Sequence, residues 1–340
     1  MLVSAAVIAV LAFAPAASAQ TPGDVTDPAD APLVYCDGDG GPLGAQTDAE
    51  HERIMPPLPF PPQLRTRTLT VDGVMTRTIE GGPRRAREAV VFVHGNPSSS
   101  KDWVHLLARV RRHGRVLAVD FPGFGDASDR QDFEYSPGRM GAWLGALLKQ
   151  VGIRRAHLVL HDFGGPWGLE WAAAHPRRLS SAVLFGTGIL VDYYGHPIAH
   201  IWRTPGIGEL SMAGTDRSLF HSAMQNGQTK PLPRDFVDRL YDDFDRMTRC
   251  SVLRLYRSFD DPDGTGNRQA KRLRPRDIPA LVIWGENDPY LPASLAERQR
   301  EAFPHARIVM YEDSAHWPFI DYPRRAAADV VPFLRRQLAR

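Results

Sequence analysis

The amino-acid sequence predicts an α/β fold in which a mostly parallel central sheet is covered by helices on both faces. Short apolar runs typical of buried strands alternate with longer helical segments over most of the chain. One stretch, residues 188–274, interrupts this alternation with helices and turns. The chain has 340 residues and 43% hydrophobic content. That is enough for one large core, so we expect one domain with an insertion.

Two segments precede the alternation. Residues 1–19 are apolar and rich in alanine, and they end in Ala17-Ser18-Ala19, which is typical of a signal peptide and its cleavage site. No Lys or Arg precedes the apolar stretch, which departs from that pattern. We predict export to the periplasm or the medium, without stable membrane insertion after cleavage. Residues 20–63 are rich in Pro, Gly and Asp and predict a flexible extension.

The core is expected to comprise residues 64–187 and 275–340. Its strands are predicted at 64–70, 74–79, 90–93, 116–121, 158–160, 182–185, 280–284 and 307–311. Its helices are predicted at 106–112, 140–151, 169–175, 293–303 and from 323 onward. The insertion, residues 188–274, is then a mainly helical cap over the carboxyl ends of the strands, where ligands bind in open α/β sheets.

Charge and cysteine content limit the classes of partner. Lys and Arg together number 41, and Asp and Glu number 39, so no strong basic field indicates a nucleic acid or an anionic membrane as partner. The two cysteines are Cys36 and Cys250. In an exported protein they can form a disulfide that ties the extension to the body, and two free thiols are the alternative.

The most informative motif follows the apolar run at residues 158–160. His161-Asp162 ends this run, Gly164 and Gly165 follow, and a helical segment begins. A strand that stops in a tight, glycine-containing turn before a helix is the nucleophile elbow, normally G-x-S-x-G, with Asp162 in the serine position. A carboxylate is already a nucleophile at neutral pH and can attack a saturated carbon. The alternative role of Asp162 is to cap the helix.

Two further residues follow strands later in the chain. Asp288 lies in the loop after the strand predicted at 280–284, and His316 lies in the loop after the strand predicted at 307–311. The order nucleophile, acid, histidine is that of α/β-hydrolases. We therefore predict Asp162, Asp288 and His316 as a catalytic triad.

A fourth motif, His94-Gly95-Asn96-Pro97, directly follows the strand predicted at 90–93. The corresponding loop of this fold supplies one backbone N–H of an oxyanion hole, and the residue after the nucleophile supplies the other. This assigns the hole to Asn96 and Phe163. His94 is expected to brace the loop rather than to take part in the chemistry.

With these four motifs, the chain from about Leu64 to its C-terminus resembles the aspartate-nucleophile branch of the α/β-hydrolase fold superfamily, which includes haloalkane dehalogenases and epoxide hydrolases. The resemblance implies that Asp162 displaces a leaving group from carbon and forms an alkyl ester. His316, oriented by Asp288, then activates water against that ester. The mechanism requires no metal or organic cofactor, and its partners are a small apolar substrate and water.

The sequence does not favour one leaving group clearly. Three features resemble dehalogenases: Leu160 two residues before Asp162, the Gly-Gly-Pro after the elbow, and the Asn96 motif. In dehalogenases the Asn of this motif donates to halide. Dehalogenases also place a Trp directly after the nucleophile, whereas Phe163 has no donor. Trp167 or Trp202 is a possible substitute. We expect a dehalogenase-like activity on a small apolar alkyl electrophile.

The first alternative is an epoxide hydrolase, which needs phenol donors from the cap. Leu255-Tyr256-Arg257 resembles the segment that carries one such Tyr, so Tyr256 is the expected proton donor. The second phenol has no clear counterpart, and Tyr193, Tyr194 and Tyr241 are candidates. A second alternative is a non-catalytic protein that uses the pocket to bind a ligand.

Overall fold

Eight strands form one sheet in the order β1-β2-β4-β3-β5-β6-β7-β8. The strands are β1 (Arg65–Val71), β2 (Val74–Gly81), β3 (Glu88–Val93), β4 (Arg115–Val119), β5 (Arg155–His161), β6 (Leu179–Phe185), β7 (Ala280–Gly285) and β8 (Arg307–Tyr311). The first two strands run antiparallel to their neighbours, and all pairs from β4 to β8 are parallel. The prediction of a mostly parallel sheet is confirmed.

This computed structural model describes residues 36, 61–130 and 132–339. The predicted signal peptide, residues 1–19, lies outside the described residues. So does the predicted extension, residues 20–63, apart from Cys36 and residues 61–63. None of the described helices is long and apolar enough to cross a membrane.

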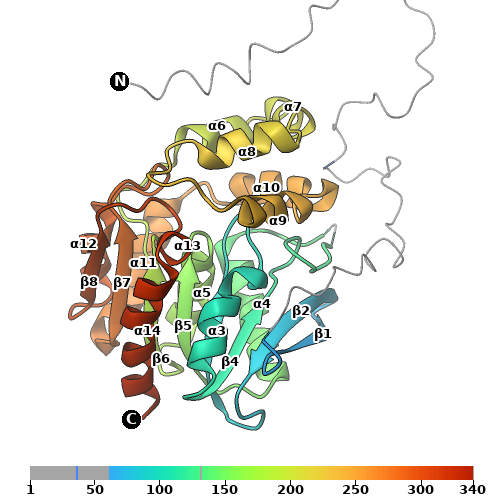
Figure 1. Cartoon of the computed structure of the whole chain (residues 1–340). Helices are drawn as coiled ribbons and strands as arrows, with labels where there is room; N and C mark the ends of the chain where they lie inside the picture. The colour runs from blue at the N-terminus through green and yellow to red at the C-terminus, as the bar shows by residue number, and fades with distance from the viewer. Residues whose placement is uncertain (1–35, 37–60, 131, 340) are drawn as a thin grey trace, which may run out of the picture.

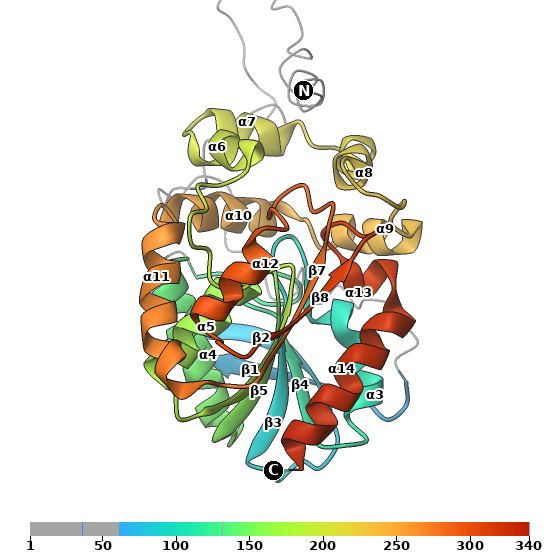
Figure 2. The same cartoon turned by 90° about the vertical axis from the view of Figure 1, so that its left-hand side faces the viewer.

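Helices cover both faces of the sheet, as expected (Figures 1 and 2). One face carries α4 (Pro137–Gln150), α5 (Gly164–Ala174) and α11 (Pro262–Leu273), and the other carries α3 (Val104–Val110) and α14 (Pro323–Leu338). The residues of β3 from Ala89 to Val93 are fully buried between these layers, which is why this run reads as continuously apolar. The short helices are η2 (Ser100–Trp103), η3 (Arg274–Arg276), α12 (Leu295–Arg298), η4 (Gln299–Glu301) and α13 (Pro318–Asp321).

The insertion lies above the carboxyl ends of the parallel strands (Figure 1). Its helices are α6 (Pro197–Arg203), α7 (Ile207–Ala213), α8 (Arg217–Gln225), α9 (Arg234–Asp242) and α10 (Arg246–Ser258). The expected cap range, 188–274, also includes α11, which packs against α5 on the face of the sheet. Gln269 of α11 donates to the carbonyl oxygen of Pro166 in α5 at 3.0 Å. We use "cap" below for α6–α10 and the loops that join them.

Buried ion pairs attach the cap to the core. Lys101, in η2, lies 2.7 Å from Asp243, which follows α9. Arg239 of α9 lies 2.5 Å from Asp102 of η2. The Ser99 hydroxyl also donates to Asp243, at 3.0 Å. Because these groups are shielded from water, the contacts constrain the position of α9 more strongly than surface pairs would.

Cys36 and Cys250 form a disulfide that spans 214 residues of sequence. Of the two alternatives left open by the sequence, the structure has the bonded one. Cys250 is in α10, and Arg254 of the same helix donates to the carbonyl oxygen of Cys36 at 2.6 Å. The disulfide therefore ties the N-terminal part of the chain to a cap helix.

Candidate active site

Asp162 lies in the turn between β5 and α5, with a φ of 50°. A non-glycine residue rarely adopts this left-handed conformation, which holds the side chain at the apex of the turn. The carbonyl oxygen of Asp162 accepts from Gly165 N–H at 2.9 Å and from the Thr187 hydroxyl at 2.5 Å. A Cβ on Gly164 would lie 2.5 Å from the carbonyl oxygen of Val93, so the close approach of this turn to β3 requires glycine.

The loop after β3 packs directly against the carboxylate of Asp162. The backbone N–H of Asn96 donates to Oδ1 of Asp162 at 2.7 Å. A Cβ on Gly95 would lie 2.3 Å from the same oxygen, so a side chain at this position would displace the carboxylate. Of the two predicted oxyanion-hole residues, Asn96 thus directs its N–H at Asp162, whereas no hydrogen bond joins the Phe163 N–H to this carboxylate.

His94 braces the Asn96 loop, as expected from the sequence. Its Nδ1 lies 2.8 Å from the carbonyl oxygen of Gly95, and its Nε2 accepts from the backbone N–H of Phe121 at 3.0 Å. The ring is therefore neutral with its proton on Nδ1. Complete burial lowers the pKa of His94 to about 4, in agreement with that state.

The structure brings Asp162, Asp288 and His316 together. Nδ1 of His316 donates to Oδ2 of Asp288 at 2.8 Å, and Nε2 of His316 lies 3.4 Å from Oδ2 of Asp162. The backbone N–H groups of Tyr290 and Leu291 hold the other oxygen of Asp288, at 2.9 and 3.0 Å. This geometry fixes the imidazole with Nε2 directed at the Asp162 carboxylate.

The electrostatics of the three residues are coupled. Burial lowers the pKa of His316, but Asp288 and Asp162 outweigh this effect and raise it to about 10. Burial raises the pKa of Asp162, but the hydrogen bond and charge of His316 hold it below its ordinary value. At neutral pH the site therefore holds an imidazolium between two carboxylates.

A second buried histidine, His161, contacts His316. His161, the last residue of β5, donates from Nε2 to the carbonyl oxygen of His316 at 2.9 Å, and the two rings lie 4.7 Å apart. Burial and the positive charge of His316 lower the pKa of His161 to about 4. A neutral His161 adds no second positive charge beside His316, and its hydrogen bond positions the backbone of His316.

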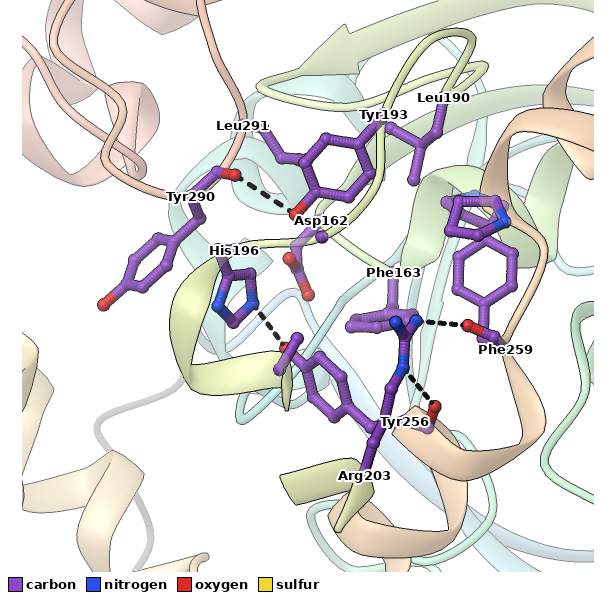
Figure 3. A pocket seen from close by; sticks show the side chains of 14 residues that line it. Asp162, Phe163, Leu190, Tyr193, His196, Arg203, Tyr256, Phe259, Tyr290 and Leu291 are labelled. Carbon is purple, nitrogen blue, oxygen red and sulfur yellow. Dashed lines mark hydrogen bonds between the residues drawn. The ribbon is translucent and has the colours of Figure 1, made fainter. Parts of the chain in front are cut away.

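A pocket lies above the Asp162 carboxylate, between the core and the cap (Figure 3). Phe163, Tyr290 and Leu291 contribute walls from the core. Pro166 of α5 and Pro262 of α11 also line it. The cap and its flanking loops contribute the remaining lining residues: Leu190, Tyr193, Gly195, His196, Ala199, Arg203, Tyr256 and Phe259. The pocket combines an apolar wall with a few polar groups near the carboxylate, which is typical of small-molecule sites.

Two polar side chains of the pocket wall form a pair. Nε2 of His196 lies 3.0 Å from the hydroxyl oxygen of Tyr256, and both residues line the pocket with Asp162 (Figure 3). Burial lowers the pKa of His196 to about 4, so its ring is neutral. Burial and the charge of Asp162 raise the pKa of Tyr256 well above 10, so its hydroxyl keeps its proton.

The other candidate donors from the sequence lie elsewhere or have other partners. Trp202 does not line the pocket, and its ring packs edge-on against Tyr256 at 4.9 Å. Tyr193 lines the pocket, but its hydroxyl donates to the carbonyl oxygen of Tyr290 at 3.2 Å. Tyr194 is 73% exposed, and Tyr241 packs against Phe220. Trp167 is fully buried beneath Phe163 and Phe121.

Sequence reasoning missed His196 as a pocket residue. It lies directly before α6, separated from Tyr256 by 60 residues, and no spacing rule connects the two. Tyr290 was also missed, although its position two residues after Asp288 was a usable signal, since a loop that presents an acid to the site presents its neighbours too. Among the described residues, no group of three or more His, Cys, Asp or Glu side chains is arranged to hold a metal ion.

A profile of the alpha/beta hydrolase fold matches residues 88–323, which is more than half of the chain. The chain belongs to this hydrolase family. A haloalkane dehalogenase from Agrobacterium fabrum is 37% identical over 113 residues, 33% of this chain and 36% of that protein. The chain thus matches only about a third of that relative's length.

A further relative of this hydrolase and one solved structure of similar fold cover more of the chain. A cis-3-alkyl-4-alkyloxetan-2-one decarboxylase from Shewanella oneidensis is 27% identical over 261 residues, 73% of this chain and 82% of that protein. The crystal structure of the haloalkane dehalogenase DatA from Agrobacterium tumefaciens C58 covers 82% of this chain and 98% of its own, with 22% identity and a TM-score of 0.71. The structural likeness supports the fold.

Proposed function

We propose that this hydrolase opens small epoxides, with Asp162 as the nucleophile and Tyr256 as the proton donor. The observation that carries the proposal is the His196–Tyr256 pair in the wall of the pocket above the Asp162 carboxylate. Opening an epoxide releases an alkoxide on the substrate itself, and this oxygen needs a proton donor. A protonated phenol with a neutral imidazole beside it supplies that donor where the ring oxygen would lie.

In the first step an oxygen of Asp162 attacks one ring carbon, and the bond from that carbon to the ring oxygen breaks. The ring oxygen takes the proton of the Tyr256 hydroxyl, and the product is a hydroxyalkyl ester of Asp162. An N–H of neutral His196 stabilises the phenolate that remains. Asp162 has lost its negative charge at this stage, which removes one of the two charges that raise the pKa of His316.

In the second step His316 acts as a base, for which it must first lose its proton. The Tyr256 phenolate accepts this proton through the pocket. Neutral His316 then takes a proton from water, and the hydroxide attacks the ester carbon of Asp162 while the Asn96 N–H binds the developing oxyanion. Collapse releases the second alkoxide, which takes the proton of the new carboxylic acid. The net reaction converts one epoxide and one water to a diol.

A second candidate is haloalkane dehalogenase activity, for which the Agrobacterium fabrum relative and Asn96 are the supporting observations. A halide leaves without a proton but needs N–H donors that bind the anion. The Phe163 side chain offers none, and Trp202 does not line the pocket. The decarboxylase relative is named for a substrate with a four-membered oxygen ring. An oxygen leaving group fits the Tyr256 donor better than a halide does.

The deciding experiment incubates the purified protein with a terminal epoxide and with a bromoalkane of equal chain length. We expect diol without bromide, and no diol from an Asp162→Asn variant. Bromide without diol would replace the proposal by the second candidate. Neither product from a folded protein would overturn both.

The covalent step has its own test. A His316→Gln variant cannot activate water, so it should accumulate the ester on Asp162 after exposure to the epoxide. Intact-protein mass spectrometry should show an increase by the mass of one substrate molecule, located by digestion to the peptide with Asp162. An unmodified His316→Gln protein, with a wild type that still forms diol, would exclude the ester mechanism.

A further inference from the structure

Arg203, in the last turn of α6, is a half-buried cation that lines the pocket of the candidate site. Its Nε donates to the carbonyl oxygen of Tyr256 at 3.0 Å, and its Nη2 donates to that of Phe259 at 2.5 Å. These two bonds fix the guanidinium plane. Its Nη1 makes no hydrogen bond to any described residue, and it lies near Gly195, which is also a lining residue.

Within the described parts of the chain, no carboxylate forms an ion pair with Arg203, whereas most half-buried arginines have one, such as Arg239 with Asp102 and Arg257 with Glu209. The carbonyl contacts explain part of its role, because they satisfy the C-terminal end of α10. They do not require a cation whose third nitrogen faces a substrate pocket. Taking a charge partly out of water without a counter-ion is costly.

The carboxylates of the candidate site do not pair with Arg203. Asp162 and Asp288 lie 3.4 and 2.8 Å from His316, and among the described residues neither forms an ion pair with Arg203. A negatively charged group on a substrate bound in the pocket would therefore supply the counter-ion that Arg203 lacks.

We propose that Arg203 forms an anion subsite, and that the substrate is an epoxide with a carboxylate at the far end of a short alkyl chain. The proposal deepens the epoxide hydrolase function and rests on it for the reacting group. The apolar residues of the pocket, such as Leu190 and Phe259, would contact the chain between the two ends. Nη1 of Arg203 would donate to the carboxylate, and the two carbonyl contacts would hold the guanidinium in place.

A binding experiment tests the subsite without any turnover. In the Asp162→Asn background, which lowers repulsion of anions, calorimetry compares hexanoate with hexanamide. We expect hexanoate to bind at least ~10-fold more tightly than hexanamide. This preference corresponds to about 1.4 kcal/mol of binding free energy. Adding Arg203→Gln should abolish it. Gln keeps an N–H donor for the α10 carbonyls but carries no charge.

The matched control is Arg249→Gln. Arg249 is also a half-buried cap arginine that donates to two carbonyl oxygens, those of Phe244 and Met212, but it does not line the pocket. The hexanoate preference should survive this change. Equal binding of hexanoate and hexanamide would overturn the subsite, and so would equal losses of the preference in the two Gln variants.

A turnover experiment separates this proposal from the epoxide hydrolase function. It compares a terminal epoxide bearing a carboxylate with its methyl ester. We expect kcat/KM to be at least ~10-fold higher for the carboxylate in the wild type and equal for both in Arg203→Gln. Equal turnover of both by the wild type would overturn the subsite and keep the function. No turnover of either, with the hexanoate preference intact, would overturn the function alone.

Discussion

The imidazole Nε2 of His196 lies 3.0 Å from the hydroxyl oxygen of Tyr256, although the two residues come from opposite ends of the cap. His196 directly precedes α6, and Tyr256 is in the last turns of α10. The Tyr256 ring also packs edge-on against Phe163, the residue after Asp162, at 5.1 Å. The cap thereby places the Tyr256 hydroxyl in the wall of the pocket that Asp162 also lines, so the cap is part of the candidate site.

The first prediction concerns that proton donor. Tyr256→Phe should lower kcat for epoxide opening by about 10²–10⁴-fold, because the alkoxide then leaves without a positioned acid. The ring packing is preserved, so KM should change little. Stopped-flow or single-turnover assays of diol formation measure this change. Tyr241→Phe, a cap tyrosine that packs against Phe220 outside the pocket, serves as the control.

A bromoalkane substrate makes the same variant more informative. Halide departure needs no proton, so an enzyme whose main activity is dehalogenation should lose little activity in Tyr256→Phe. Unchanged diol formation in Tyr256→Phe would contradict the role of Tyr256 as acid.

The second prediction follows from the pKa of His316, which Asp288 and Asp162 raise to about 10 against the opposing effect of burial. The folded protein holds this proton more tightly than the unfolded chain does. The resulting stabilisation is complete below the ordinary pKa of histidine, about 6.5, and is lost as the pH rises through about 10. Urea unfolding of wild type should show a free energy of unfolding that falls over this range.

In His316→Gln that decline should be much smaller. His113→Gln, which removes an exposed imidazole, should leave the decline as in wild type. If the free energy of unfolding of wild type and of His316→Gln declined in parallel, His316 would not be protonated at neutral pH.

Most of the fold was predictable from the sequence, because the local signals agree with the tertiary structure. The run from Val90 to Val93 is apolar since both faces of β3 are covered, and the turn Asp72-Gly73 between β1 and β2 has the positive φ values that a tight hairpin requires. The extent of the cap was less predictable. Nothing in the local pattern of α11 tells whether a helix lies on the sheet or over the strand ends.

For the site, prediction was good where one rigid element fixes one residue. Asp162, Asp288 and His316 each follow a parallel strand, so their convergence follows from the sheet. His196 and Arg203 are different, because their positions depend on how α6 packs against α10. A single sequence carries no information about this packing. For the same reason, the expectation of a small apolar substrate took no account of Arg203.

The third prediction concerns the Cys36–Cys250 disulfide. Replacing both cysteines by serine should lower the free energy of unfolding by roughly 2–4 kcal/mol, because the unfolded chain regains the freedom of a 214-residue loop. Chemical unfolding of wild type and of the double serine variant, each with and without reductant, measures this decrease in the free energy of unfolding. Reductant should destabilise wild type by a similar amount and leave the double serine variant unchanged. A thiol assay that finds two free cysteines in the purified, unreduced protein would contradict the bond.

The last prediction concerns the buried pair between Lys101 and Asp243, which joins η2 to the cap. Both side chains are only 3–4% exposed. A second carboxylate, Asp126, lies farther from Lys101, at 3.4 Å, and is more exposed, so neutralising Asp243 removes the closer and better shielded counter-charge. Asp243→Asn should therefore lower the free energy of unfolding by about 3 kcal/mol. The double variant Lys101→Met with Asp243→Leu removes both charges and should be less destabilised than Asp243→Asn alone, although it has one more substitution. Thermal and urea unfolding of the two variants provide the comparison. If the double variant were the less stable of the two, the pair would stabilise the attachment of the cap by more than its desolvation costs.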